Sequence, residues 1–170
     1  IKNDANFKNF NEFSVYTNVD NLLYISGGRT RNGNMSKEFY SFNSNTSDLT
    51  RLSDMIKERC SHSLLYIKPN EIYAVGGYNN NTTERYFINT NRWERLPDLN
   101  SRDRQVPTLF SHKNLIICMF GYINNYIDAD DYYERLDILN PKKWEVIKIK
   151  NTANRYDLKL YNVGIIQMDK

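Results

Sequence analysis

Short apolar runs separated by polar turns recur along the chain, and the clearest pair lies near its middle. Residues 63–67 are largely apolar, residues 68–71 form a polar stretch, and residues 72–75 are apolar again. Two such runs joined by a short segment that contains Pro and Asn are typical of a β-hairpin. The pattern therefore predicts two antiparallel strands at 63–67 and 72–75.

The segment after this hairpin predicts two more strands. Gly76-Gly77 ends the second apolar run, and a polar loop follows it. Residues 84–89 then predict a third strand, residues 90–92 a tight turn, and Trp93 opens a fourth strand. The whole unit is a predicted four-stranded antiparallel sheet, and we expect no helix longer than two turns in it.

This unit is repeated in the chain. Residues 63–77 align without gaps on residues 14–28 and on residues 107–121, and the alignment brings the glycines of the three stretches together. Downstream, residues 45–55 match residues 89–99. A period of about 45–50 residues with four strands in each unit predicts the blades of a β-propeller.

The middle unit resembles a kelch repeat. In that family a glycine pair closes the second strand, and an aromatic residue and a tryptophan follow. Gly76-Gly77, Tyr86 and Trp93 stand in this order, and Arg59 opens the unit as in many kelch repeats. The resemblance implies an all-β fold, a kelch-type β-propeller segment of four-stranded antiparallel blades.

The neighbouring units keep part of this pattern. The first retains the glycine pair Gly27-Gly28 and Tyr40, but Leu49 stands where tryptophan is expected. The third retains Trp144 and departs from the pattern at its first glycine and at its aromatic residue. Three units that resemble one family at the same spacing are more specific than a single glycine pair.

The repeat divides the chain into segments. We expect the tail of a preceding blade or a linker at 1–12, blades at 13–56, 57–101 and 102–150, and the start of a further blade at 151–170. Closed propellers use about 4–8 blades. Three blades form an incomplete ring, so we expect further blades from the same longer chain.

Several positions of the repeat are expected to be structural. Glycine leaves a strand at positive φ without the steric cost that a Cβ would bring. Tryptophan is large and flat, and it suits the wedge between diverging blades. The structural residues predicted in this way are Gly27, Gly28, Gly76, Gly77, Gly121, Tyr86, Trp93 and Trp144.

Candidate chemistry changes this picture little. The glycine pairs lack the helix and the further glycines that a phosphate-binding loop needs. The only histidines are His62, expected to be structural, and His112, expected at an exposed turn. They and two distant cysteines do not supply the converging ligands of a metal site. An acidic cluster, Asp128, Asp130, Asp131 and Glu134, is expected to be a solvated loop. We expect no cofactor, no metal and no enzyme activity from this segment.

Composition excludes several classes of partner. Hydrophobic residues make up 40% of the chain and charged residues 25%, which suits a packed globular protein. The net charge of +3 comes from scattered basic residues rather than a stripe, so we expect no nucleic-acid binding. No apolar run is long enough to span a membrane, and we expect a cytoplasmic protein.

The loops are the remaining candidates for function. Loops on a rigid scaffold usually carry binding residues, and Arg and Tyr are enriched at interface hot spots. The predicted binding residues are Arg29, Arg31, Arg59, Tyr78, Asn80, Arg102, Arg104, Tyr122, Asn124 and Asp130. These loops are expected to lie on one face, basic in the first blade and acidic in the third.

We therefore predict a non-catalytic module that binds a protein or peptide partner rather than a small-molecule substrate. Kelch resemblance implies two settings, a substrate receptor of a ubiquitin-ligase adaptor or a cytoskeletal scaffold. The alternative is a propeller enzyme of the galactose-oxidase-like or sugar-processing type, whose active site would lie outside this segment.

Overall fold

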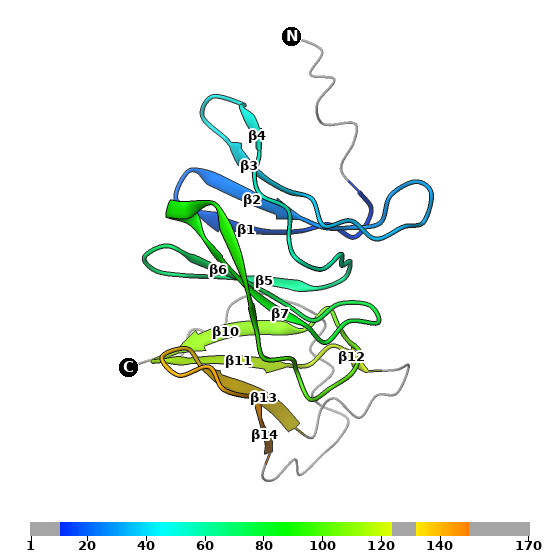
Figure 1. The fold of residues 1–170 in the computed structure, drawn as a ribbon, viewed down its shortest axis with the longest axis vertical. Helices are drawn as coiled ribbons and strands as arrows, with labels where there is room; N and C mark the ends of the chain where they lie inside the picture. The colour runs from blue at the N-terminus through cyan, green and yellow to red at the C-terminus, as the bar shows by residue number, and fades with distance from the viewer. Residues whose placement is uncertain (1–10, 124–131, 150–170) are drawn as a thin grey trace.

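Three four-stranded antiparallel sheets stack along the long axis of the molecule in the computed structural model (Figure 1). The structure describes residues 11–123 and 132–149. Sheet 1 has the order β1-β2-β3-β4. Its strands are β1 (Val15–Val19), β2 (Leu22–Ser26), β3 (Phe39–Asn43) and β4 (Leu49–Arg51).

Sheets 2 and 3 repeat this meander. Sheet 2 consists of β5 (Ser63–Ile67), β6 (Glu71–Val75), β7 (Thr83–Phe87) and β8 (Arg92–Leu96). Sheet 3 consists of β10 (Thr108–His112), β11 (Leu115–Met119), β13 (Tyr132–Asp137) and β14 (Glu145–Lys148). Two short strands, β9 (Arg104–Gln105) and β12 (Tyr122–Ile123), pair beside sheet 3.

The predicted fold class is confirmed. The described residues are almost entirely strands and turns, and they form no closed ring. Between residues 57 and 100 the one helical element is a three-residue 3-10 turn at Ile88–Thr90. The predicted third strand is shorter than expected, because this turn occupies its last residues before Asn91 in the left-handed conformation.

The observed register corrects the gapless alignment. Ser63 pairs with Val75 in sheet 2, while Val15 pairs with Ser26 in sheet 1. Because the turn between β5 and β6 is one residue longer than that between β1 and β2, Ser63 corresponds to Val15 rather than to Ser14.

The register also changes which aromatic residue of the first unit corresponds to Tyr86: it is Phe42 rather than Tyr40. In sheet 2, Tyr86 pairs with Ile72. The residue of sheet 1 that is equivalent to Ile72 is Leu23, and Leu23 pairs with Phe42. Tyr40, predicted to match Tyr86, stands instead where sheet 2 has Glu84. The alternation of side chains across a strand makes two residues two places apart share a face, which is why Tyr40 could be mistaken for Phe42.

An aromatic core fills the space between sheets 1 and 2. Phe39 of sheet 1 lies with its ring centroid 5.0 Å from that of Trp93 and 4.8 Å from that of Tyr86 in sheet 2. The indole Nε1 of Trp93 donates a hydrogen bond of 2.9 Å to the carbonyl of Ser53. Trp93 therefore holds the segment that leaves sheet 1 against sheet 2.

A second core repeats this arrangement between sheets 2 and 3. Tyr73, Val75 and Leu96 of sheet 2 pack against Ile116 and Leu136 of sheet 3 and against Trp144. The indole Nε1 of Trp144 donates 3.0 Å to the carbonyl of Pro97, the position equivalent to Ser53. Both tryptophans thus lie between neighbouring sheets, as the repeat predicted.

The first glycine of each pair allows the next linker to approach. A Cβ on Gly27, whose φ is +63°, would lie 2.4 Å from the carbonyl oxygen of Arg59. A Cβ on Gly76, whose φ is +69°, would lie 2.6 Å from the carbonyl oxygen of Arg104. Glycine is required here both by backbone conformation and by space.

We expect Gly76→Ala to lower the free energy of unfolding much more than Gly33→Ala. Gly33 also has a positive φ, of +81°, but an added Cβ meets nothing within 4 Å there. Gly33→Ala should therefore cost only the left-handed strain of about 1–2 kcal/mol. Gly76→Ala adds a backbone clash, and urea denaturation of both variants measures the difference. Equal losses in the two variants would contradict the close approach of the linker.

Candidate functional site

The loops that join second to third strands and the linkers between sheets emerge on one side of the stack. In Figure 1 these connections lie on the side opposite the β1–β2 and β5–β6 turns. We call this side the loop face. It comprises residues 27–38, 52–62, 76–82, 97–107 and 120–123.

The first two sheets meet on this face through a cation–π contact. The guanidinium carbon of Arg29 lies 5.4 Å from the centroid of the Tyr78 ring. Arg29 belongs to the loop after β2, and Tyr78 to the loop after β6. Tyr78 remains 39% exposed, so the pair presents both a ring and a positive charge to the outside.

Other predicted binding residues on this face are also accessible. Arg31 and Arg102 are exposed, and Tyr122 is 62% exposed. Asn124 and Asp130 lie outside the described residues, and so does the predicted acidic end of the face. The described part of the loop face carries accessible cations and aromatic rings. It also carries the carboxylates of Glu38, Asp54, Glu58 and Asp98, each of which pairs with a neighbouring cation.

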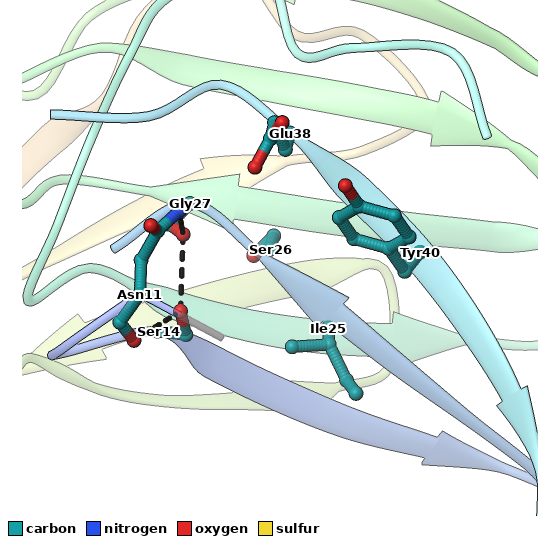
Figure 2. Close-up of a pocket in the computed structure, with 7 residues that line it drawn as sticks. All are labelled: Asn11, Ser14, Ile25, Ser26, Gly27, Glu38 and Tyr40. Atoms are coloured by element: carbon teal, nitrogen blue, oxygen red, sulfur yellow. Dashed lines mark hydrogen bonds between the residues drawn. The ribbon is translucent and has the colours of Figure 1, made fainter. Parts of the chain in front are cut away.

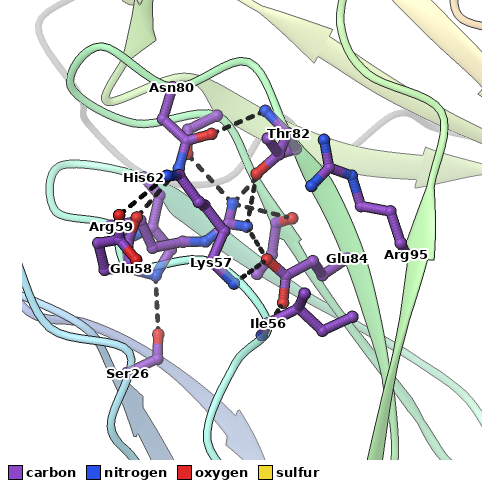
Figure 3. A network of polar contacts seen from close by, with 12 residues as sticks. Ser26, Ile56, Lys57, Glu58, Arg59, His62, Asn80, Thr82, Glu84 and Arg95 are labelled. Atoms are coloured by element: carbon purple, nitrogen blue, oxygen red, sulfur yellow. Dashed lines mark hydrogen bonds and ion pairs between the residues drawn. The ribbon is translucent and has the colours of Figure 1, made fainter.

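Arg59 is buried, which corrects its prediction as an exposed binding residue (Figure 3). Its guanidinium forms an ion pair with Glu84 of β7, and both side chains are fully inaccessible. Nη1 also donates to the carbonyls of Gly76, at 3.2 Å, and Thr82, at 3.1 Å. Burial lowers the pKa of Arg59, and the Glu84 carboxylate opposes that shift.

The Glu84 carboxylate in turn holds the linker that enters sheet 2. Its two oxygens accept the backbone N–H groups of Ile56, at 2.7 Å, and Lys57, at 2.9 Å. The carbonyl of Arg59 accepts the N–H of Gly28 in the loop after β2, at 2.9 Å. One arginine thus bonds to both of the sheets that its linker joins.

The same arrangement recurs one sheet later, and it corrects the predictions for Arg104 and Glu134. Both side chains are fully buried, with Arg104 Nη2 3.6 Å from Glu134 Oε1. Glu134 accepts the N–H of Asn100, at 2.6 Å, and the hydroxyl of Ser101, also at 2.6 Å. The carbonyl of Arg104 accepts the N–H of Gly77 at 2.9 Å. Glu134 is therefore not part of a solvated acidic loop.

Asn80, also predicted as a binding residue, is buried and organises its own loop. Its side-chain oxygen accepts the N–H of Thr82 at 2.9 Å, and its amide donates to the carbonyl of Glu58 at 3.3 Å. Asn80 therefore ties the loop after β6 to the linker from sheet 1, and its side chain is not available to a partner.

Sheet 1 lacks the buried ion pair. The register places Asn11 where Arg59 and Arg104 stand, and Tyr40 where Glu84 and Glu134 stand. Asn11 Nδ2 donates to the carbonyl of Gly27 at 3.2 Å, as Arg59 does to Gly76. The shorter side chain leaves a cavity of about 10 Å³ beside Glu38 and Tyr40 (Figure 2).

A groove of about 340 Å³ runs along the starts of the first strands, and no feature of the sequence predicted it. The residue two places before each first strand is left-handed: Phe13 has a φ of 57°, Ser61 of 53° and Val106 of 48°. Phe13 is 62% exposed and Val106 40% exposed. The groove is lined by Phe13, Ser14, Val15, Tyr16, Ser61, His62, Ser63, Val106 and Pro107.

His62, which contributes to the lining of this groove, is buried and has a structural contact. Its Nε2 is 2.7 Å from the hydroxyl of Ser26, and its Nδ1 has no hydrogen-bond partner. Burial, assisted by the nearby positive charge of Arg59, holds the pKa of His62 well below its ordinary value of 6.5. His112 is exposed beside the β10–β11 turn, as expected.

The cysteines and the acidic residues offer little chemistry in the described part of the chain. Cys60 and Cys118 are both free and buried, and burial raises the pKa of Cys118 to about 12. Over the described residues no three His, Cys, Asp or Glu side chains converge as metal ligands would. The same residues contain no helix that is long and apolar enough to cross a membrane.

Comparison with known proteins identifies the middle unit. Residues 59–100 match the family model of the kelch motif. The match begins at Arg59, the first member of the buried ion pair, and contains all four strands of sheet 2. The resemblance found in the sequence is therefore confirmed.

The curated relatives are poxvirus proteins. The kelch repeat and BTB domain-containing protein 2 of cowpox virus strain GRI-90 is 36% identical over 85 residues. The proteins of the same name from ectromelia virus strain Moscow and from horsepox virus are 36% and 33% identical. The matches cover 48% of this chain and 15% of the length of each relative.

We expect Arg59→Met and Glu84→Met each to lower the free energy of unfolding by about 3–5 kcal/mol, because each leaves one buried charge unpaired. The double variant should lose less than the sum of the two. Arg51→Met is the control, since Arg51 pairs with Glu38 and Asp54 near the surface, where each pair should be worth about 0–1 kcal/mol. Urea denaturation gives all four values, and additive losses at Arg59 and Glu84 would show that the two groups are not coupled.

The depressed pKa of His62 predicts a stability that depends on pH. Below about pH 6.5 the unfolded chain binds a proton that the folded chain excludes, so the free energy of unfolding falls as the pH falls. The limiting slope is about 1.4 kcal/mol per pH unit. Unfolding in urea between pH 7.5 and pH 5 measures it. His62→Gln should remove this component and the exposed control His112→Gln should leave it; the opposite pattern would refute the assignment.

Proposed function

We propose that this chain of kelch-type blades is a non-catalytic protein-interaction module that binds a protein or peptide on its loop face. The single observation that carries the proposal is the contact of Arg29 with Tyr78 across two sheets. It assembles one accessible surface from loops that are almost fifty residues apart in the sequence.

The arginines of the chain divide into two groups, and this division supports the proposal. Arg59 and Arg104 form ion pairs with buried carboxylates. Arg31 and Arg102 are exposed on the loop face and have no carboxylate within ion-pair distance among the described residues. An exposed guanidinium next to accessible aromatic rings is the combination found at many interface hot spots.

The chemistry of the face indicates the chemistry of the partner. The loop face carries exposed apolar side chains at Ile56, Tyr78 and Val106. It also carries exposed cations at Arg31, Lys37, Lys57 and Arg102, of which Lys57 pairs with Glu58. A complementary ligand carries carboxylates around one or two apolar side chains. We therefore propose an acidic peptide segment with an aromatic or aliphatic anchor.

The relatives suggest the setting in which such a module acts. Their printed names combine kelch repeats with a BTB domain. This combination supports the adaptor setting, in which the loop face would receive the substrate of a ubiquitin ligase, over the cytoskeletal one. Two free, buried thiols suit the reducing cytoplasm in which we expect the protein to act.

A peptide selection tests this proposal. The purified chain is panned against a random displayed peptide library, and enriched sequences are synthesised and titrated by fluorescence polarisation. We expect acidic peptides with an apolar residue to be enriched. Arg29→Glu combined with Arg31→Glu should weaken their binding at least tenfold, and the loss should shrink at high salt because these charges are accessible.

The control reverses a charge on the opposite side of the molecule. Lys68 is exposed in the β5–β6 turn, and Lys68→Glu should leave the affinity within about twofold. If Lys68→Glu weakens peptide binding and the double arginine variant does not, the binding site lies on the side of the β5–β6 turn. Enrichment of basic peptides would contradict the proposed charge complementarity.

A further inference from the structure

The loop between β2 and β3 contains a narrow hairpin that projects from the stack (Figure 1). Arg29 forms an antiparallel bridge with Met35, and the N–H of Thr30 donates a hydrogen bond of 2.8 Å to the carbonyl of Asn34. Residues 31–34 at the tip are all exposed. The hairpin is therefore held at its base, while its tip is open to solvent.

The tip contains the one Asn-Gly step of the sequence, Asn32-Gly33. In such a step the backbone nitrogen of the glycine can attack the side-chain amide carbon of the asparagine, because glycine has no Cβ to obstruct the approach. The space beside Gly33 is open, since an added Cβ would meet nothing within 4 Å. The side chain of Asn32 forms no hydrogen bond to any described residue, so no contact holds its amide away from this reaction.

We propose that Asn32 is a site of spontaneous deamidation. The backbone nitrogen of Gly33 loses its proton to solvent and bonds to Cγ of Asn32, and the side-chain amide nitrogen leaves as ammonia. Water then opens the resulting five-membered imide. Cleavage of the bond between Cγ and the Gly33 nitrogen gives aspartate, and cleavage of the bond between the main-chain carbonyl carbon and that nitrogen gives isoaspartate. The net reaction consumes water, releases ammonia and leaves a carboxylate, and nothing is oxidised or reduced.

The fold restrains the asparagines that would otherwise be the next to react. Serine is the smallest residue that follows any other asparagine, and it follows Asn43 and Asn100. Oδ1 of Asn43 accepts two backbone N–H groups of the turn that follows it, at 2.9 and 3.3 Å. Nδ2 of Asn100 donates to the Glu134 carboxylate and to the carbonyl of Trp144, each at 3.0 Å. Both amides must break these bonds before they can react, and the amide of Asn32 has none to break.

The hairpin also sets the rate of the reaction. The N–H of Gly33 donates a hydrogen bond of 2.8 Å to the carbonyl of Thr30, and this bond must open before the nitrogen can attack. It lies in an exposed turn, where water can replace the carbonyl at little cost. We therefore expect Asn32 to react in the folded chain, but more slowly than in the unfolded one.

The reaction changes the charge of the loop face. It lowers the formal net charge of the chain, +3, by one and puts a carboxylate next to Arg31. The consequence for acidic peptides rests on the proposed function. Asn32→Asp introduces the carboxylate directly, and it should weaken the binding of the selected acidic peptides about two- to fivefold, as expected for an accessible charge near a binding site.

Peptide mapping by mass spectrometry tests the modification. After incubation of the folded chain at mildly alkaline pH, we expect aspartate and isoaspartate at position 32 in preference to positions 43 and 100. The chain unfolded in urea is the control and should react faster at position 32. Gly33→Ala should slow the reaction of the folded chain about tenfold, which corresponds to about 1.4 kcal/mol on the barrier. Mildly acidic pH should slow it as well, because the backbone nitrogen must lose its proton.

The outcomes separate the modification from its effect on binding. A folded chain that stays unmodified at position 32 while the urea control reacts overturns the proposal, because the bond to Thr30 then blocks the attack. Modification concentrated at position 43 or 100 also overturns it, as does a rate that Gly33→Ala leaves unchanged. If circular dichroism shows that Gly33→Ala does not fold, the pH dependence decides, and a rate that does not rise with pH excludes attack by the backbone nitrogen. Unchanged peptide affinity in Asn32→Asp contradicts only the place of this loop in the binding site.

Discussion

The buried guanidinium at the start of a blade is the interaction on which the arrangement of the sheets depends. Arg59 bonds backward through its carbonyl to Gly28 and forward through its side chain to Glu84. Removing two charges from water is costly, and only good geometry with further hydrogen bonds compensates for it. Glu84 meets that requirement by also accepting two linker N–H groups. The ion pair, the linker and the glycine of the preceding sheet can therefore form only together, and this fixes how one sheet follows the next.

The loop face follows from this constraint. Because each linker is fixed at its arginine, the left-handed residue two places later always faces the groove, as Ser61 and Val106 do. The N–H of Val106 bonds to the carbonyl of Ser61, which links these entrances directly. The proposed binding residues Tyr78 and Arg102 lie on backbone that the buried network already holds, so we expect substitutions there to leave the fold intact. Loops on rigid scaffolds are typically built in this way, with buried residues that hold the backbone and different, exposed residues that are free to bind a partner.

The repeat, the strand order and the interblade tryptophans could be predicted from the sequence, because periodicity and glycine pairs report local backbone and packing. Whether an individual arginine is buried or exposed could not be predicted from the sequence. Arg59 and Arg31 both follow apolar strands in polar segments, and only the partner of Arg59, twenty-five residues later in β7, separates them. One signal was available in the middle unit: Glu84 opens the predicted third strand, where an unpaired carboxylate would be unfavourable. The one-residue slip in the alignment was hidden because a longer turn changes the register without changing the apolar pattern.

Sheet 1 shows what happens when the constraint is relaxed. With Asn11 and Tyr40 in place of the pair, one amide bond to Gly27 replaces the several bonds of a guanidinium, and a small cavity remains. Sheet 1 also lacks the tryptophan, because Leu49 stands at the position that Trp93 occupies in sheet 2. Sheet 1, which lacks both the ion pair and the tryptophan, is the one described sheet that follows no other described sheet. The buried ion pairs and the tryptophans are therefore found at the two interfaces where the described chain joins one sheet to the next.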